Sequence, residues 1–149
     1  MRVQKSLEAS ERNFNYAQQL AQLGSWEYFV PQDTLFWSDE VYRIFEIDPT
    51  KYDPSYQVFL ETIHPDDRDK VHDAYNTSLK TREPYNIIHR ITVPDGRVKL
   101  VQERGQTFFS EKGDALRTIG TVQDISEMSD QLPELTELSS LLKKEALTS

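Results

Sequence analysis

Histidines and the carboxylates beside them are the side chains of this sequence best suited to metal binding or acid–base chemistry. The segment His64-Pro65-Asp66-Asp67 places an imidazole next to two carboxylates, a donor set that suits divalent metals. The same four residues are also typical of a helix start, because proline fits the first turn and acids stabilise its positive end. We favour the helix start, with both acids exposed, and therefore predict no metal site.

Motifs of catalytic sites are absent from the sequence. It contains no phosphate-binding loop, no glycine-rich dinucleotide fingerprint, no His-Glu-x-x-His metalloprotease motif and no nucleophile elbow. The absence of cysteine excludes a cysteine nucleophile, a cysteine-ligated zinc, a disulfide framework and a flavin–cysteine adduct. We therefore expect no enzymatic activity in this chain, although a longer parent protein could carry a kinase or cyclase domain.

Aromatic residues, 11% of the sequence, are the second group of interest, because their flat faces can line a pocket for a small ligand. They can equally form an ordinary core, which is their commoner role. In the segment 85–93, alternation places Ile87, His89 and Ile91 on one face, which the isoleucines mark as the interior. His89 is then either a polar group of the pocket or a core histidine with satisfied hydrogen bonds. The candidate pocket residues are Trp26, Tyr28, Phe36, Tyr42, Phe45, Phe59, Tyr75 and His89.

The overall charge argues against two classes of partner. A net charge of −8 and a pI of about 4.9 disfavour binding to nucleic acid or to an anionic membrane, since both partners are polyanions. No apolar stretch approaches the ~20 residues that span a bilayer, and the first residues lack the apolar region of a signal peptide. We therefore expect a cytoplasmic chain without direct membrane contact.

The elements that must position these residues follow from hydrophobic periodicity. Residues 4–22 form an amphipathic pattern that ends at Gly24, which predicts an N-terminal helix within residues 1–22. That helix could cover the domain as a lid or pair with a second copy, since both roles use the same apolar stripe. Strands are expected at 25–30, 34–37, 85–93, 97–109 and 115–122, and helices at 39–45, 52–63 and 65–80.

This order of elements predicts an α+β fold for residues 23–126. Short turns join consecutive strands into a five-stranded antiparallel sheet, with the helices on one face. After the last strand, Asp124 is a good helix N-cap with Glu127 three residues later, which predicts a C-terminal helix over residues 127–149. Pro133 interrupts the apolar seam of that helix and indicates a break followed by a second helix.

Taken together, these segments resemble a PAS domain, in the aromatic-rich form found in bacterial sensory proteins. The resemblance rests on the segments 23–27, 37–45, 63–68, 95–97 and 120–127. Similar domains carry a tryptophan near the basic residue of the second long strand, where this chain has Lys99 followed by Leu100. The departure removes one family packing contact and leaves the expected fold unchanged.

The resemblance implies a sensory input domain of bacterial signal transduction. Such a domain binds a small ligand or dimerises, and it relays its state to an output module. That module would be a histidine kinase of a two-component system or a cyclic-dinucleotide enzyme in the same polypeptide. We expect a homodimer, and we expect the relay at Asp124, Ile125, Ser126 and Glu127.

Two alternative functions stay open. PAS domains that bind haem use a histidine on the long helix before the third strand, which makes His72 the haem candidate. One alternative is therefore a haem- or flavin-binding redox or gas sensor. The other is a module without ligand or cofactor that serves protein interaction and dimerisation.

Overall fold

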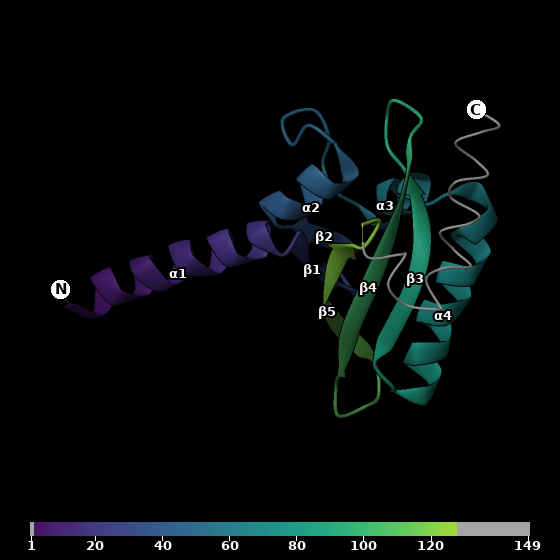
Figure 1. Ribbon diagram of the computed structural model, residues 1–149. Coiled ribbons are helices and arrows are strands. Elements are labelled where there is room, and N and C mark those ends of the chain that lie inside the picture. Colours follow the sequence, from purple (N-terminus) through teal and green to yellow (C-terminus); the bar gives the residue numbers. More distant parts are fainter. Residues whose placement is uncertain (1, 128–149) are drawn as a thin grey trace.

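The computed structural model describes residues 2–127, and its helices and strands follow the order expected from the sequence (Figure 1). The C-terminal helix expected over residues 127–149 falls outside the described residues, apart from Glu127. The elements are α1 (Arg2–Leu20), β1 (Leu23–Phe29), β2 (Thr34–Trp37), α2 (Asp39–Phe45), α3 (Tyr56–Thr62), the 3-10 turn η1 (Pro65–Asp67), α4 (Arg68–Thr81), β3 (Tyr85–Thr92), β4 (Val98–Phe109) and β5 (Ala115–Asp124).

The strands form one antiparallel sheet in the spatial order β2-β1-β5-β4-β3. β1 and β5 pair with each other although the whole domain separates them in sequence, and Leu23 lies opposite Gln123. The entry to the domain and the exit from it therefore lie side by side at one end of the sheet. The α+β class and the five-stranded antiparallel sheet predicted from the sequence are confirmed.

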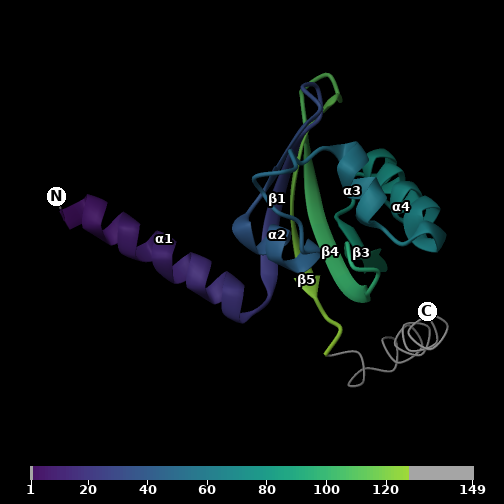
Figure 2. The same ribbon diagram turned by 90° about the horizontal axis from the view of Figure 1, so that it is seen from above.

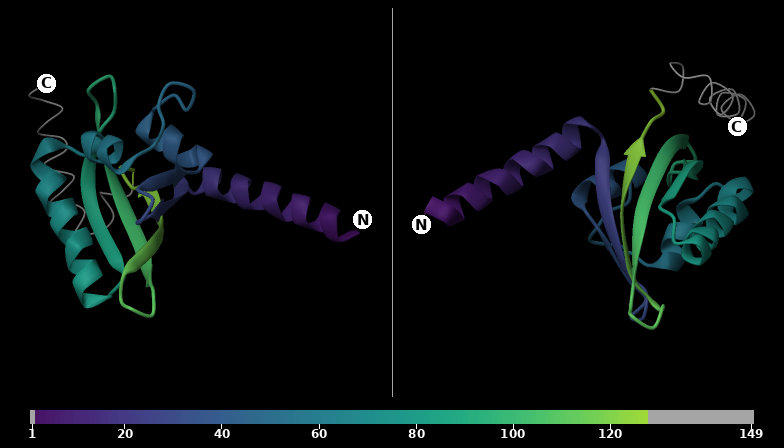
Figure 3. Two further views of the ribbon diagram at one scale, coloured as in Figure 1. Left: turned by 180° about the vertical axis from the view of Figure 1, so that it is seen from behind. Right: turned by 90° about the horizontal axis from the view of Figure 1, so that it is seen from below.

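The helices α2, α3 and α4 cover one face of the sheet (Figures 1 and 2). α4 packs along β3, while α2 packs against β1 and β2. α1 meets the sheet at β1 and extends away from the domain (Figure 3). In this arrangement α1 does not cover the domain as a lid, so pairing with a second copy is the role that stays open. None of the helices in residues 2–127 combines the length and the apolar character that crossing a bilayer requires.

The core lies between the sheet and its helical layer, and it consists of two main clusters. Val41 and Phe45 of α2 pack with Trp37 of β2 at one end. Val71 of α4 packs with Ile87 of β3 at the other end. Both clusters border an internal cavity, so the packing that stabilises the fold also shapes the candidate site.

Residues around His64 form the expected helix start, but only one of the two acids is exposed. The Nδ1 atom of His64 accepts a hydrogen bond from the backbone N–H of Asp66 at 3.1 Å and caps η1. The Asp66 side chain is 76% exposed, as predicted. Asp67 is buried, which corrects the prediction, because it binds the guanidinium of Arg90 through both carboxylate oxygens at 2.8 Å and 3.0 Å. This ion pair ties η1 to the edge strand β3.

α3 begins later than the sequence pattern indicated. The expected helix started at Tyr52, whereas the observed helix starts at Tyr56. Pro54 disfavours helical geometry in the residue before it, and Ser55 then caps the helix by accepting a hydrogen bond from the N–H of Val58 at 3.0 Å. The delayed start leaves Tyr56 in the first turn, from which it reaches the cavity.

Candidate functional site

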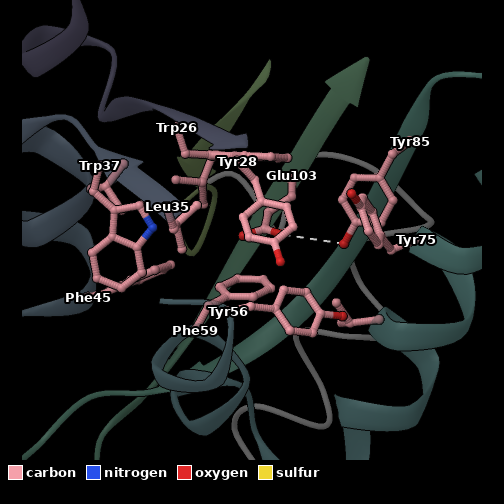
Figure 4. Close-up of a pocket in the computed structure, with 13 residues that line it drawn as sticks. Trp26, Tyr28, Leu35, Trp37, Phe45, Tyr56, Phe59, Tyr75, Tyr85 and Glu103 are labelled. Carbon is pink, nitrogen blue, oxygen red and sulfur yellow. Dashed lines mark hydrogen bonds between the residues drawn. The ribbon is translucent and has the colours of Figure 1, made fainter. Parts of the chain in front are cut away.

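An internal cavity of about 40 Å³ lies between the inner face of the sheet and the helical layer (Figure 4). Its wall is apolar and largely aromatic, and Glu103 is the single charged side chain among the described residues of the wall. One water molecule needs a cavity of roughly 10–15 Å³, so this cavity has room for a ligand of a few heavy atoms. The lining residues are Trp26, Tyr28, Leu35, Trp37, Val41, Phe45, Tyr56, Phe59, Val71, Tyr75, Tyr85, Glu103 and Val122.

The indole of Trp26 lies flat against the inner face of the sheet, and two glycines make room for it. Strand pairing places Gly120 of β5 beside Trp26, and Gly105 of β4 beside Gly120. A Cβ atom at Gly120 would overlap the indole, and one at Gly105 would lie 3.0 Å from its Cη2 atom. The indole can therefore extend over β5 and β4. Its Nε1–H is buried and has no hydrogen-bond partner within residues 2–127.

Three tyrosines contribute ring faces to the cavity while partners outside the wall hold their hydroxyl groups. The Tyr28 hydroxyl donates to Asp33 at 2.5 Å, and the Tyr56 hydroxyl lies 3.1 Å from Nδ1 of His72. The Tyr75 hydroxyl pairs with a buried threonine of β5 at 2.9 Å. Burial is the main cause that raises the pKa of all three tyrosines above the usual value, so they stay neutral at physiological pH.

Tyr56 lies at the centre of this aromatic wall. Its ring centroid is 5.7 Å from that of Tyr28 and 6.3 Å from those of Phe59 and Tyr75. We call these four residues together with Trp26 the aromatic cage. Because the face of an aromatic ring carries partial negative charge, the cage offers an electrostatically negative surface without a hydrogen-bonding group at its centre.

Glu103 of β4 places a carboxylate in the wall beside the aromatic cage. Its side chain is 3% exposed, and its Oε2 atom accepts a hydrogen bond from the Tyr85 hydroxyl at 3.3 Å (Figure 4). The Nε2 atom of His89 lies 3.4 Å from the same oxygen, outside good hydrogen-bond geometry. One phenol group and one imidazole group, both from β3, thus approach the same carboxylate oxygen.

The protonation of His89 depends on this carboxylate. Its Nδ1 atom lies 3.1 Å from the backbone oxygen of Arg90, which can only accept, so Nδ1 carries a hydrogen. Nε2 then meets Glu103 favourably only when it is protonated as well. Burial disfavours the imidazolium form, but the Glu103 carboxylate, with smaller contributions from the Arg90 backbone oxygen and Asp67, outweighs burial and raises the pKa of His89 above its usual value.

The prediction that Phe36 lines the pocket is wrong. Phe36 is 61% exposed, because Leu35 and Trp37 point inward and strand alternation turns the residue between them outward. The structure brings together the predicted residues Trp26, Tyr28, Phe45, Phe59 and Tyr75.

Tyr42 and His89 are the other predicted pocket residues that do not line the cavity. Tyr42 packs edge-on against Trp37, with 5.4 Å between ring centroids, and borders a separate surface hollow beside α2. His89 is fully buried on the predicted face of β3, but it lies behind Glu103. It therefore acts on the cavity through that carboxylate and not as part of the wall.

Several residues of the wall were missed by reasoning from the sequence. Glu103 follows the inward-facing Val101 by two positions and precedes the inward-facing Gly105 by two, so alternation in β4 could have found it. Tyr85 and Tyr56 stand at the first positions of a strand and a helix, where periodicity is weakest. The remaining residues carry no signal that separates a cavity wall from ordinary core: Leu35, Trp37, Val41, Val71 and Val122.

The sequence matches the PAS fold family over residues 34–122, which run from β2 to the inner part of β5 and include most of the cavity wall. This chain belongs to the PAS family. The match covers the resemblance segments 37–45, 63–68 and 95–97 and the first residues of 120–127, and the antiparallel sheet with helices on one face agrees with it.

This PAS domain is similar in sequence or in fold to domains of three other proteins. It is 27% identical over 106 residues to a probable diguanylate cyclase of Escherichia coli K12, DgcE, and the alignment covers 71% of this chain and 9% of the relative. A sensory box histidine kinase/response regulator from Burkholderia thailandensis E264 shares the fold, with a TM-score of 0.69 and 24% identity over 88% of this chain and 98% of that structure.

The third relative is the N-terminal domain of a diguanylate cyclase with a PAS/PAC sensor from Marinobacter aquaeolei. Its TM-score is 0.62 at 13% identity, over 69% of this chain and 94% of that structure. The chain is therefore a PAS sensor domain similar to those of histidine kinases and diguanylate cyclases. It spans less than a tenth of the Escherichia coli cyclase.

The residues of this PAS domain do not fit a haem or a flavin. His72 lies on the exposed side of α4, and its two ring nitrogens contact Tyr56 at 3.1 Å and Asn76 at 3.0 Å. Turning His72 inward would break both contacts. The cavity measures about 40 Å³, whereas benzene alone occupies an engineered cavity of about 150 Å³ in another protein. The haem candidate and the flavin alternative gain no support from this geometry.

The exit from the sheet lies at the predicted relay residues. Asp124 is the last residue of β5, and its Oδ1 atom accepts a hydrogen bond from the N–H of Ser126 at 3.0 Å. Ile125 donates its N–H to the backbone oxygen of Leu100 at 2.9 Å, and the Ser126 hydroxyl accepts from the N–H of Leu100 at 3.0 Å. Glu127 is exposed in the turn that follows. The helix that Asp124 was predicted to cap lies outside the described residues.

Proposed function

We propose that this PAS domain is the signal input module of a longer signalling protein, and that occupancy of its cavity changes the state of an output module. The observation that carries the proposal is that β4 and β5 form part of the cavity wall and also hold the exit from the sheet. Val122 lines the cavity two residues before Asp124, and Glu103 lies three residues after Leu100. A displacement of the wall therefore reaches the exit along two paired strands.

The exit from the sheet is also hydrogen-bonded to the two residues that follow α1. The N–H of Asp124 donates to the backbone oxygen of Gln22 at 3.2 Å, and the Gln123 side chain donates to that of Ala21 at 3.2 Å. Movement at the end of β5 would thus reach both segments that flank the domain. This arrangement supports a relay in which the orientation of the flanking helices carries the signal.

A homodimer formed through α1 and the outer face of the sheet belongs to the same proposal. Phe14, Tyr16 and Leu20 of α1 are 60%, 64% and 69% exposed. Tyr16 and Leu20 are four residues apart and share one face of the helix, whereas Phe14 faces another side. Beside the base of α1, a surface groove is lined by Phe14, Gln18 and Ile119 among others. A second copy placed there would bury both apolar surfaces.

The output module is proposed from the relatives. The Escherichia coli relative is a probable diguanylate cyclase, and the Burkholderia thailandensis relative is a histidine kinase/response regulator. A cyclase or kinase domain in the same polypeptide therefore suits this PAS domain, which would act in the cytoplasm. The relay residues at the exit, Asp124 to Glu127, would connect to that domain.

The relay can be tested by changing the cavity wall without touching the exit. Val71→Ile adds one methyl group to a fully buried wall residue of α4, far from β5 in sequence. We expect amide hydrogen exchange at Leu100 and Ile125 to change, because the added methyl presses on the wall that these strands share. Val58→Ile, in a residue of α3 that packs on the core but does not line the cavity, is the matched control.

Unchanged exchange at the exit in Val71→Ile would remove the support for a relay through β4 and β5. It would favour a module that only pairs with a partner, since such a module has no need to couple its interior to its exit. An equal change in Val58→Ile would show a general loosening of the core and would count against the relay too.

A further inference from the structure

We infer that the cavity is a binding site for a small organic cation, an alkylammonium ion of about two to four heavy atoms, with Glu103 as its counter-ion. The inference rests on the proposed ligand-binding role of this PAS domain and adds the chemical class of the ligand. Three features of the wall carry it: the open carboxylate oxygen, the aromatic cage and the charge of the surroundings.

Glu103 has one oxygen available for a ligand. Tyr85 and His89 both approach Oε2, at 3.3 Å and 3.4 Å, and no hydrogen bond from residues 2–127 reaches Oε1. An ionised carboxylate oxygen can accept two hydrogen bonds, so a ligand N–H donor can bind Oε1 without displacing either neighbour. The hydrogen bond would join two opposite charges at a carboxylate whose side chain is 3% exposed, and hydrogen bonds between charged groups are the strong kind.

The aromatic cage suits a cation better than a neutral or anionic ligand. A cation is attracted to an aromatic face within about 6 Å of the ring centroid. The centroids of Tyr28 and Tyr56 are 5.7 Å apart, so a cation beside one ring also lies close to the second. The hydroxyl groups of these rings are bonded elsewhere, and the buried indole N–H of Trp26 is the unpaired donor that the described wall offers to an anion.

The charges around the cavity also favour a cation over an anion. An anion in the cavity would lie against the Glu103 carboxylate, whose side chain is 3% exposed and poorly screened by solvent. The whole chain carries a net charge of −8, which raises the local concentration of cations and lowers that of anions. Asp33, which accepts from the Tyr28 hydroxyl at an exposed position, adds a carboxylate near the cavity.

A bound cation and the proton of His89 compete for the same carboxylate. The ionisable groups around His89 are Glu103 of β4, Tyr85 and Arg90 of β3, and Asp67 of η1. Asp67 and Arg90 form an ion pair at 2.8 Å, and Glu103 is the largest of the causes that favour the charged form of His89. The cation is therefore expected to bind more tightly as the pH rises and His89 loses its proton.

The test compares a cation with a neutral molecule of the same size. Ethylammonium chloride and ethanol each have three heavy atoms, and sodium chloride controls for ionic strength. Binding to the full chain is followed by isothermal titration calorimetry and by the fluorescence of Trp26 and Trp37, which both line the cavity. The variants are Glu103→Gln, and Glu83→Gln as a matched loss of one exposed carboxylate.

We expect ethylammonium to bind at least about tenfold more tightly than ethanol, a difference of about 1.4 kcal/mol. Glu103→Gln should abolish that preference, Glu83→Gln should retain it, and Tyr56→Leu should weaken ethylammonium binding. Equal binding of the two probes by the native chain would overturn the cation assignment while leaving a general ligand cavity, as would a preference that survives in Glu103→Gln.

Binding of neither probe would also overturn the cation assignment. The proposed input role would then be judged by the exchange experiment on Val71→Ile, which does not depend on any ligand. The comparison of the two probes uses the native chain, so its result stands even if a variant fails to fold.

Discussion

The position of Trp26 depends on two residues that have no side chain. Its indole can lie over β5 and β4 because Gly120 and Gly105 face it from these strands. The indole N–H is buried and has no hydrogen-bond partner among the described residues, and burying such a group costs free energy. At the scale of residues, the cavity thus depends on the small size of two glycines as much as on the large rings around it.

Adding one methyl group to each glycine tests this account. Gly120→Ala should lower the free energy of unfolding by about 1–3 kcal/mol, because its Cβ atom would overlap the Trp26 indole and the backbone oxygen of Arg104. Gly105→Ala should cost less, because its nearest atom would be a ring carbon at 3.0 Å and the ring can shift. Urea unfolding followed by circular dichroism gives both values. An equal or greater cost at Gly105 would contradict this placement of Trp26.

The pair formed by His89 and Glu103 makes stability depend on pH in a defined direction. Because Glu103 raises the pKa of His89 in the folded state, the pair stabilises the fold fully below the unfolded histidine value of about 6.5. That contribution is lost as the pH rises through the higher pKa of the folded state. The difference in unfolding free energy between the native chain and Glu103→Gln should therefore shrink as the pH rises above about 6.5.

Urea unfolding at each pH measures this difference, and an NMR titration of the His89 ring identifies the group responsible. Glu83→Gln, which removes an exposed carboxylate, should show a pH profile parallel to that of the native chain. A difference that stays constant across this pH range would mean that His89 does not change its charge with Glu103 as partner.

At the scale of elements, the ion pair of Asp67 and Arg90 joins η1 to β3. Burial raises the pKa of Asp67, but hydrogen bonds from Arg90 and its charge outweigh burial and lower that pKa overall. Asp67→Asn should cost roughly 3 kcal/mol of unfolding free energy, because it removes a buried carboxylate charge that the buried Arg90 guanidinium binds. Asp66→Asn, at a side chain that is 76% exposed, should change stability little. Similar losses from the two variants in urea unfolding would refute this role of the pair.

The order of the helices and strands could be predicted from hydrophobic periodicity. The contacts that shape the cavity could not. Alternation of apolar residues and turn signals predicted the strands, and the aromatic pattern predicted Trp26, Tyr28 and Phe45 in the interior. The burial of Asp67 depends on a residue 23 positions away, and the contact of Tyr85 with Glu103 joins two strands. Such contacts form only when separate elements meet, and local patterns carry no trace of them.

At the scale of the whole molecule, apolar surface remains exposed on and beside α1. Phe14 and Leu20 are 60% and 69% exposed on α1, and Ile119 is 38% exposed on the outer face of β5. Phe14 and Ile119 line the same surface groove. A symmetric dimer would place this surface of one copy against the same surface of the other, so that each contact occurs twice.

Ile119→Glu tests this dimer without disturbing the core. Its side chain points away from the cavity, so the variant should keep its unfolding free energy within about 0.5 kcal/mol of the native value. It should nevertheless shift the sedimentation coefficient of the chain from dimer to monomer, because two carboxylates would be buried at symmetric positions of the interface. Tyr52→Glu, at an exposed aromatic side chain between α2 and α3, introduces the same charge elsewhere and should leave the dimer intact. A native chain that sediments as a monomer up to millimolar concentration would refute the dimer, and dissociation in both variants would indicate a general effect of added charge.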